Sequence, residues 1–252
     1  MNSILMIMNS PQAEANWFES WFNTPYYHIL YKDRDDSEAQ LFMDNLTHYL
    51  NLPENGSILD LACGKGRHAV YLNQLGYQVT GMDISENSIA HASQYANESL
   101  QFKVHDMREP ITEQFDAVFN LFTSFGYFDE TADNIKALHV IKNSLSEYGF
   151  GVIDFLNASY VIANLVPEET KHIDGITFNI KRYVEHKKII KEIEVIDNDK
   201  TFLFKEKVSA LYLEDFEKMM EQCGIYMLDI FGDYKLKKFY KNESERLIMI
   251  FK

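Results

Sequence analysis

The chain has 252 residues, which is enough for one large α/β domain or for one domain with a modest insertion. Hydrophobic residues make up 46% of it, so a sizeable core is available and extensive disorder is excluded. The formal net charge is −14, and such a surface repels phosphate backbones at long range. The charge therefore argues against DNA or RNA as the substrate.

The sequence lacks the usual signs of export or membrane insertion. Its two cysteines, Cys63 and Cys223, do not make a disulfide framework in a chain of this length. The apolar run from Ile4 to Met8 is too short for a signal peptide and has no basic flank. No stretch approaches the length of a membrane span. We therefore expect a cytoplasmic protein that does not associate with membranes.

Residues 1–36 are rich in aromatic side chains, which predicts an N-terminal cap or lid rather than a separate domain. Residues 37–50 then have the periodicity of an amphipathic helix. The side chains expected on its apolar side are Leu41, Phe42, Leu46, Tyr49 and Leu50.

From residue 57 onward, predicted strands alternate with predicted helices. This order favours a parallel sheet with right-handed crossovers. The strand at 117–122 is apolar on both faces, as a central parallel strand should be. The predicted strands are 57–62, 78–82, 100–104, 117–122 and 151–155, and the predicted helices are 67–75, the segment that Ser85 caps, and 132–146.

Between residues 176 and 208 most hydrophobic residues alternate with polar ones. This pattern predicts three antiparallel strands joined by turns at 186–188 and 197–200, and we assign residues 171–209 to this inserted sheet. The α/β pattern resumes with a helix at 213–223 and strands at 226–232 and 246–251, so the main domain is expected to comprise 37–170 and 210–252.

The strongest local signal is the run Ile58–Ala69, in which a buried strand enters a glycine-rich turn and then a helix. Gly64 and Gly66 lack Cβ atoms, so the backbone can turn tightly and a ligand can lie against it. The N–H groups of the following helix face the same place. Because the spacing also fits a relaxed dinucleotide-binding fingerprint, the turn alone does not identify the ligand.

Three acidic residues follow three successive strands. Asp60 lies at the end of the first, Asp83 at the end of the second and Asp106 at the end of the third. Asp83 is placed to accept hydrogen bonds from ribose hydroxyls. Three carboxylates at neighbouring strand ends describe a cleft for a nucleoside that carries positive charge. S-adenosylmethionine fits this description better than a pyrophosphate-bearing cofactor does.

These motifs, taken in order, resemble those of class I S-adenosylmethionine-dependent methyltransferases over about residues 40–155. The resemblance implies an α/β fold: a Rossmann-like, mostly parallel seven-stranded sheet with helices on both faces, with the small antiparallel sheet inserted after the fifth strand. It implies S-adenosylmethionine as cofactor and S-adenosylhomocysteine as product, and no metal ion. The matching segments are Ile58–Gly66, Gly81–Ser85, His105–Met107 and Phe115–Val118.

The resemblance also implies a role for individual residues. Asp60 and Gly64 would neighbour the methionine portion, Asp83 would hold the ribose, and an aromatic lid would contribute Tyr31. Ala62 stands where the family usually has glycine, which we expect to be a small perturbation of the turn. The full predicted cofactor site is Tyr31, Asp60, Ala62, Gly64, Gly66, Asp83, Ile84, Asp106, Met107, Asn120 and Phe122.

Methyl transfer is an in-line displacement on an activated carbon, so proximity, alignment and exclusion of water supply most of the catalysis. A general base matters only if the nucleophile arrives protonated, and the candidates are Tyr127, Asp154 and His105. The segment Thr123–Phe128 lacks the Pro-Pro-aromatic signature of enzymes that methylate adenine or amide nitrogens. Together with the acidic charge, this favours a small-molecule acceptor.

Other interpretations stay open at this point. An NAD-dependent oxidoreductase would place a pyrophosphate on Gly64 and Gly66, although the charge of Asp60 would then lie close to a diphosphate. A non-catalytic cofactor-binding protein would assemble through the inserted sheet, and the sequence leaves a homodimer open. Arg67 and His68, on the first turn of a helix, are expected on a solvated face.

Overall fold

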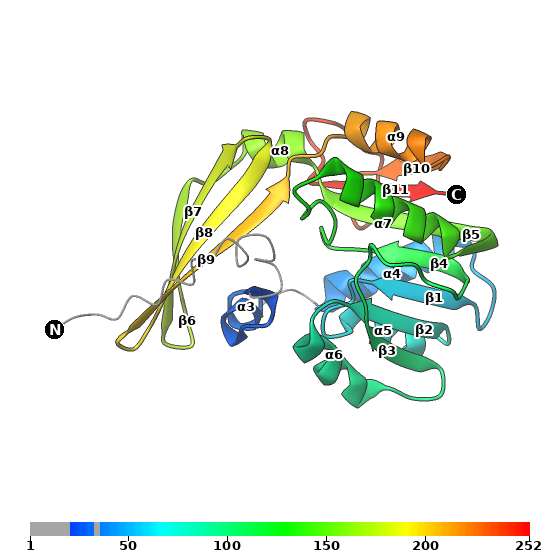
Figure 1. Cartoon of the computed structure of the whole chain (residues 1–252), viewed down its shortest axis with the longest axis horizontal. Helices are drawn as coiled ribbons and strands as arrows, with labels where there is room; N and C mark the ends of the chain where they lie inside the picture. Colours follow the sequence, from blue (N-terminus) through cyan, green and yellow to red (C-terminus); the bar gives the residue numbers. More distant parts are fainter. Residues whose placement is uncertain (1–20, 33–35) are drawn as a thin grey trace. The chain divides into compact units, whose positions relative to one another are not determined.

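The computed structural model describes residues 21–32 and 36–252 (Figure 1). Much of the predicted N-terminal cap, residues 1–20 and 33–35, lies outside the described residues. Within the described ranges, no helix is both long and apolar enough to cross a membrane.

The described chain divides into two compact units. The larger unit consists of residues 36–161 and 211–252, and the smaller unit consists of residues 21–32 and 162–210. The predicted glycine-rich turn and the three acidic residues all belong to the larger unit, so the site is described there.

Seven strands form the sheet of the larger unit, in the order β10-β11-β5-β4-β1-β2-β3. β1 pairs in parallel with both β2 and β4, and β11 is antiparallel to β5 and β10. The strand order therefore reverses at β1 and β4, where parallel α/β sheets bind ligands. This sheet confirms the predicted fold class. The strands are β1 (Ser57–Leu61), β2 (Gln78–Asp83), β3 (Leu100–Val104), β4 (Phe115–Asn120), β5 (Leu145–Leu156), β10 (Met227–Phe231) and β11 (Arg246–Phe251).

Helices cover both faces of this sheet (Figure 1). Right-handed crossovers place α5 and α6 on one face, because β1, β2 and β3 follow one another in one direction. The step from β4 to β5 runs the other way, so α7 lies on the opposite face. α4 packs on α5, and α9 packs on α7. The helices are α4 (Asp36–Leu50), α5 (Arg67–Gln74), α6 (Glu86–Ala92), a 3₁₀ turn (Ser93–Tyr95), α7 (Thr131–Asn143), α8 (Ala158–Ala163) and α9 (Leu213–Gln222).

The middle of the sheet is the core of the larger unit. Ile58 and Leu59 of β1 and Val118 and Phe119 of β4 are fully buried, although neighbouring residues in a strand point to opposite faces. Helices on both faces explain this pattern. The polar residues that end these strands are thereby fixed on a rigid support.

α4 buries part of the side that we predicted, including Phe42, Leu46 and Leu50, and leaves the rest exposed. Phe42, Met43 and Leu46 are fully buried, whereas Leu41 and Tyr49 are 41% and 43% exposed. The Tyr49 hydroxyl donates to an Asp229 carboxylate oxygen at 2.5 Å, so its polar end is satisfied at the surface. The assignment of Leu41 and Tyr49 to the buried side was wrong.

The smaller unit contains a four-stranded antiparallel sheet in the order β6-β7-β8-β9. Three strands were predicted there; β6 was missed because its residues Glu168–Ile173 are mostly polar and show no hydrophobic alternation. Two-residue turns join the strands, and positive φ at Asp174, Gly175 and His186 is typical of such hairpins. The other strands are β7 (Ile176–Glu185), β8 (Lys188–Asp197) and β9 (Lys200–Ser209).

Helix α3 (Pro25–Leu30) and the preceding residues belong to the same unit as this sheet. Trp21 packs on Phe204 with ring centroids 4.6 Å apart, and its indole N–H donates to a Glu206 carboxylate oxygen at 2.7 Å. Tyr26 packs on Phe202 at 5.1 Å. Aromatic residues of the predicted lid therefore pack on one face of the inserted sheet.

Candidate active site

The turn that follows β1 has an unusual backbone. Ala62, Gly64 and Gly66 have φ values of 66°, 56° and 83°, in the left-handed region. The N–H groups of Ala62 and Cys63 both donate to the Met82 carbonyl, at 2.7 and 3.0 Å, which ties the turn to β2. A left-handed alanine costs about 1–2 kcal/mol. Ala62 is therefore a strained residue rather than the small perturbation that we expected.

The two glycines of the turn differ in what surrounds the position of a Cβ atom. A Cβ at Gly66 would lie 2.8 Å from the Phe102 ring, so this residue permits close packing of the turn on the sheet. A Cβ at Gly64 would meet nothing within 4 Å. Gly64 thus borders open space, where a ligand can lie against the backbone.

Asp83 joins the ends of β1 and β2. One of its carboxylate oxygens accepts the Gly64 N–H at 2.8 Å, and the other accepts the Ser85 N–H at 2.8 Å. Burial raises the pKa of Asp83, and these two N–H groups oppose the rise. Each oxygen keeps a lone pair for a further donor.

Asp60 is deeply buried, with 1% of its surface exposed. Burial and the nearby charge of Asp83 raise the pKa of Asp60 to about 7, although the Ala69 N–H and the charge of Arg67 lower it. Its Oδ2 has no hydrogen-bond partner among the described residues. A buried acceptor in this state is costly, and it points to a donor that is brought by a ligand.

Asn120 presents a second acceptor of the same kind at the end of β4. Its amide nitrogen donates to the Leu61 carbonyl at 3.0 Å, whereas its Oδ1 has no partner within the described ranges. Asn120 is fully buried. Since β1 and β4 are neighbours, two unsatisfied oxygens lie at the reversal of strand order, where a ligand is expected.

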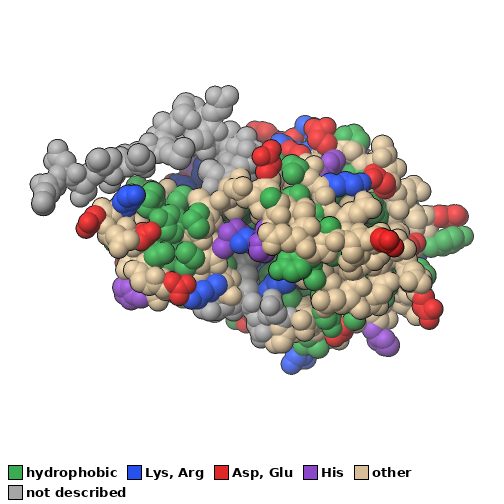
Figure 2. Space-filling model, turned by 90° about the horizontal axis from the view of Figure 1, so that it is seen from below, with side chains coloured by type: hydrophobic (Ala, Val, Ile, Leu, Met, Phe, Trp, Pro, Cys, Tyr) green, Lys and Arg blue, Asp and Glu red, His purple; other side chains and the backbone are tan. Residues whose placement is uncertain are grey.

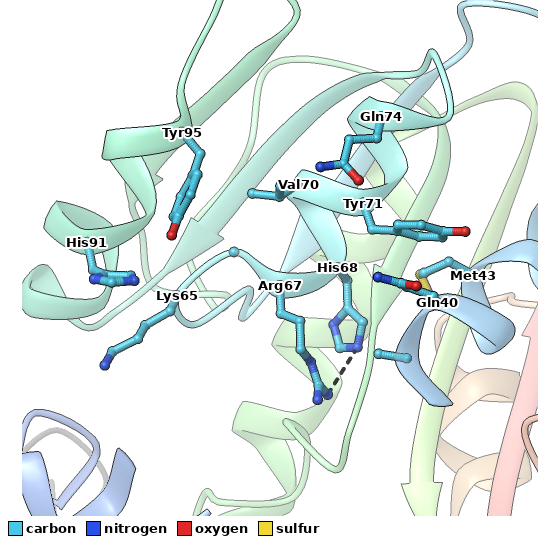
Figure 3. Close-up of a pocket in the computed structure, with 12 residues that line it drawn as sticks. Gln40, Met43, Lys65, Arg67, His68, Val70, Tyr71, Gln74, His91 and Tyr95 are labelled. Atoms are coloured by element: carbon cyan, nitrogen blue, oxygen red, sulfur yellow. Dashed lines mark hydrogen bonds between the residues drawn. The ribbon is translucent and has the colours of Figure 1, made fainter. Parts of the chain in front are cut away.

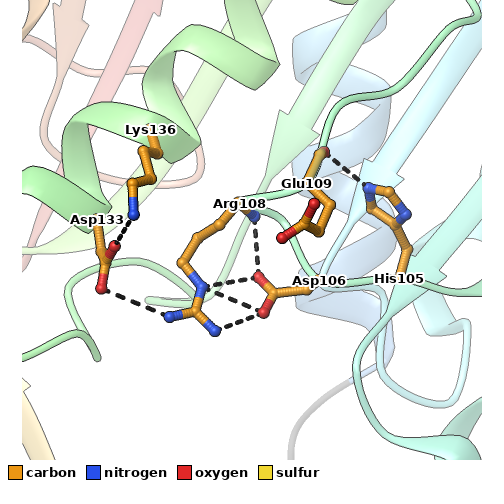
Figure 4. Close-up of polar contacts among 6 residues, drawn as sticks. All are labelled: His105, Asp106, Arg108, Glu109, Asp133 and Lys136. Carbon is orange, nitrogen blue, oxygen red and sulfur yellow. Dashed lines mark hydrogen bonds and ion pairs between the residues drawn. The ribbon is translucent and has the colours of Figure 1, made fainter.

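Asp106, the third predicted acid, is already paired (Figure 4). Arg108 Nε lies 3.0 and 3.1 Å from the two oxygens of Asp106, and its Nη2 lies 2.6 Å from Oδ2. Burial raises the pKa of Asp106, but Arg108 outweighs burial and the pKa is lowered. Arg108 reaches on to Asp133 at 3.5 Å. Arg108 was not among the predicted site residues, although its position two residues after Asp106 was a signal for this pairing.

Asp154, a candidate general base, forms a buried ion pair with Arg246. It is fully buried, and Arg246 Nε and Nη2 lie 2.8 and 2.7 Å from its Oδ1. Its Oδ2 accepts the Phe122 N–H at 2.8 Å, and its backbone carbonyl accepts the Thr123 N–H at 2.9 Å. Phe122 and Thr123 have φ of 57° and 62°. The buried ion pair therefore holds the strained turn that follows β4.

The Phe122 side chain links this turn to the one that follows β1. Its ring stacks on Tyr234 with centroids 5.3 Å apart, and the rings of Phe122 and His68 are 5.1 Å apart. The Arg67 guanidinium carbon lies 4.6 Å from the centre of the Phe122 ring. His68 is only 7% exposed, so the expectation of a solvated face was wrong for this residue. Tyr234 had no local motif that could have identified it.

The remaining predicted residues lie after the ends of β2, β3 and β4 or in the smaller unit. Ile84 and Met107 are half-buried just after β2 and β3. His105 and Tyr127 are half-buried after β3 and β4. Tyr31 belongs to the smaller unit, where its hydroxyl donates to Glu206 at 2.7 Å and accepts from Lys191.

Comparisons with known proteins agree on one class of enzyme. A family model described as a methyltransferase domain matches residues 58–149, which include β2, β3, β4 and all but the first residue of β1. The YqeM protein of Bacillus subtilis, which carries a provisional methyltransferase assignment, is 28% identical over 200 residues, covering 73% of this chain and 79% of that protein. A sugar N,N-dimethyltransferase of Streptomyces venezuelae, whose acceptor is named as a dTDP-3-amino-trideoxyglucopyranose, is 29% identical over 103 residues, covering 40% of this chain and 43% of that one.

A solved structure extends the likeness of fold to most of the chain. A S-adenosylmethionine-dependent methyltransferase from Clostridium acetobutylicum superposes with a TM-score of 0.76 at 22% identity, covering 90% of this chain and 95% of that one. This likeness concerns the fold, including the order of the strands in the seven-stranded sheet. The matched domain and the sequence relatives identify the chain as a S-adenosylmethionine-dependent methyltransferase. This activity removes the NAD-dependent alternative.

The buried charge of Asp60 predicts that Asp60→Asn gains thermal stability, by an amount that depends on pH. The pKa of Asp60 in the folded protein, about 7, lies above that of an unfolded aspartate, about 3.9. Its ionisation therefore lowers the free energy of unfolding as the pH rises between these values. We expect Asp60→Asn to melt close to wild type at pH 4 and above it at pH 8, in cofactor-free thermal melts. Glu54→Gln, at an exposed acid, is the charge control, and a pH-independent difference for Asp60→Asn would contradict the prediction.

The buried ion pair predicts a large loss of stability for Arg246→Met. Removal of one partner leaves the Asp154 charge buried and unpaired, which typically costs about 3–5 kcal/mol. Urea unfolding followed by circular dichroism measures this loss. Lys252→Met removes an exposed cation just after the same strand and is the matched control. A loss below about 1 kcal/mol, the range of a surface pair, would show that Asp154 is stabilised in another way.

Proposed function

We propose that S-adenosylmethionine binds along the carboxyl ends of β1, β2 and β4. The observation that carries this proposal is the pair of buried, unpartnered oxygens on Asp60 and Asn120. The methionine portion of the cofactor ends in an ammonium group, which has three N–H donors and a positive charge. The open space beside Gly64 supports the same location.

The nucleoside portion is proposed to lie across the ends of β2 and β3. Asp83 keeps acceptor capacity for the ribose hydroxyls, and Ile84 would pack on the adenine. Met107 and Asp106 would flank the adenine amino edge. Because both oxygens of Asp106 already accept from Arg108, we expect this carboxylate to contribute less to affinity than Asp83 does.

The turns that follow β1 and β4 would border the methionine portion and the reacting methyl group. We propose that Ala62 and Gly66 shape the first turn, and that Phe122 lines the floor. Tyr31 is proposed to belong to the lid, on the resemblance stated above.

We propose that the methyl acceptor is a small molecule with an amine nitrogen. Several relatives are named for N-methylation, including the sugar enzyme above and a glycine/sarcosine N-methyltransferase of Aphanothece halophytica. The chain's net charge of −14 disfavours nucleic acid as the methyl acceptor. On the described part of the face drawn in Figure 2, basic side chains are interspersed with acidic ones. The cofactor supplies an activated methyl group. The amine lone pair forms the new N–C bond as the C–S bond breaks, and the product ammonium then releases its proton to water.

This chemistry asks little of the protein beyond orientation and exclusion of water. An amine that arrives unprotonated needs no general base for its attack. That agrees with the pairing of Asp154 with Arg246, which leaves Tyr127 and His105 as proposals for a base. We further propose a cytoplasmic location, which two free and buried cysteines support.

The open space at Gly64 predicts a selective loss of affinity in Gly64→Ala. The new methyl group would occupy the space that we assign to the cofactor. Gly76→Ala is the matched control, because Gly76 also has positive φ and would also place a Cβ in open space, but it ends α5 far along the chain from the turn. We expect calorimetry with S-adenosylhomocysteine to show a loss of at least about tenfold for Gly64→Ala only. Equal affinities in the two variants would place the cofactor elsewhere.

Asp83 predicts a larger loss of affinity than Asp106. A hydrogen bond to a charged group contributes about 1.5–3 kcal/mol, so Asp83→Ala is expected to weaken S-adenosylhomocysteine binding at least about tenfold. Asp106→Ala is expected to weaken it less. Thermal melts check that both variants fold, and Asp83→Asn tests whether loss of the charge alone has this effect. An unchanged affinity in Asp83→Ala would refute the ribose role.

The acceptor class is tested with methyl-labelled S-adenosylmethionine and a panel of small amines, alcohols and thiols. We expect label in amines, read by mass spectrometry. Transfer to oxygen or sulfur alone would overturn the nitrogen proposal. Cofactor binding without transfer to any compound of the panel or of a metabolite extract would favour the non-catalytic alternative.

A further inference from the structure

A pocket of about 340 Å³ lies on the larger unit between α4, α5 and the end of α6 (Figure 3). Four of its described lining residues have basic side chains: Lys65, Arg67, His68 and His91. None of its twelve described lining residues is acidic. This reverses the balance of the chain, which has 38 acidic and 24 basic residues. The pocket is therefore a local site of positive charge on an acidic protein.

The basic and titratable groups are arranged around the beginning of α5, and Lys65 and Arg67 are the cations among them. Figure 3 shows Lys65, Arg67 and His68 extending to the same side of that helix, with His91 presented by α6. No ion pair involves Lys65 within the described ranges, and partial burial lowers the pKa of its ammonium group. The partial positive charge of the helix N-terminus adds to these side chains. Such an arrangement suits an anionic group.

The pocket is larger than one small anion requires. It extends along α5 from Arg67 to Gln74, which is roughly 10 Å at 1.5 Å per residue. Tyr71 and Tyr95 supply aromatic surface along this length. An occupant therefore has an anionic end and a further part that contacts apolar and amide groups.

The basic end of the pocket is next to the proposed reaction site. The Arg67 guanidinium and the His68 ring both contact the Phe122 ring, which we place near the reacting methyl group. A molecule whose anionic group contacts Arg67 can thus reach toward Phe122. In the proposed function, the ammonium group of the cofactor already donates to Asp60 and Asn120.

We propose that this pocket binds an anionic group, a phosphate or carboxylate, of the methyl acceptor. The inference rests on the proposed function, since it concerns the acceptor of the same reaction. The same chemistry has a second source, the carboxylate of the cofactor's own methionine portion. The experiment must therefore separate acceptor from cofactor.

Calorimetry with inorganic pyrophosphate and with citrate tests the pocket on protein saturated with S-adenosylhomocysteine. We expect at least one of these anions to bind wild type and to lose at least tenfold in affinity in Lys65→Gln/Arg67→Gln. Lys136→Gln/Lys218→Gln removes the same charge from α7 and α9 and should stay within twofold of wild type. His91→Gln tests the α6 side without altering the glycine-rich turn. Failure of both anions to bind, or equal losses in the two double variants, would overturn the proposal.

The cofactor is excluded as the source by comparing S-adenosylhomocysteine with 5′-methylthioadenosine, which lacks the amino-acid carboxylate. We expect Lys65→Gln/Arg67→Gln to bind both nucleosides within threefold of wild type. A tenfold loss for S-adenosylhomocysteine alone would assign the basic residues to the cofactor and overturn the inference, while the proposed function would stand. Wild-type protein without affinity for S-adenosylhomocysteine would instead overturn the proposed function, and the inference with it.

Discussion

The burial of a carboxylate at the point where the strand order reverses is the constraint on which this site depends. Asp60 lies at the end of β1 between β2 and β4, so it is enclosed on both sides by the sheet and covered by α5. Removal from water penalises its charge, and no described residue donates to its Oδ2. The proposed ligand, which brings a positive charge and N–H donors, would remove this penalty. Under this proposal, the unfavourable burial of Asp60 in the apoprotein would contribute to the affinity for the cofactor.

Asp154 shows what a buried carboxylate looks like when its role is structural. It also lies near the carboxyl end of a strand and is fully buried, but Arg246 and the Phe122 N–H satisfy both of its oxygens. The same residue type in the same region of the sheet thus has two different environments, and the presence of internal partners distinguishes them. Sequence position places both residues near strand ends, whereas the hydrogen bonds show which carboxylate is satisfied by the protein itself.

The parts that sequence could predict are those in which local pattern and local structure agree. β3 and β11 have the predicted bounds, because continuous apolar or alternating runs with clear ends specify a strand. β6 was missed because a polar strand has no such pattern, and its partner β7 provides the pairing. The burial of His68 could not be predicted either, since it depends on Phe122, more than fifty residues away in the chain. Contacts between distant segments leave no local signal.

Three strained residues of the larger unit lie at the same strand ends as the unsatisfied acceptors. Ala62, Phe122 and Thr123 have positive φ without being glycine, and they lie within three residues of the ends of β1 and β4. In the smaller unit, positive φ at His186 and Lys187 is ordinary hairpin geometry. The strand-end residues have no such explanation; they are held by Met82 and by the Asp154–Arg246 pair. Strain that is maintained by buried partners fixes the backbone before a ligand arrives, and a preorganised site loses less entropy on binding. Rigid turns beside buried acceptors that lack hydrogen-bond partners suit an enzyme that works mainly by aligning its reactants.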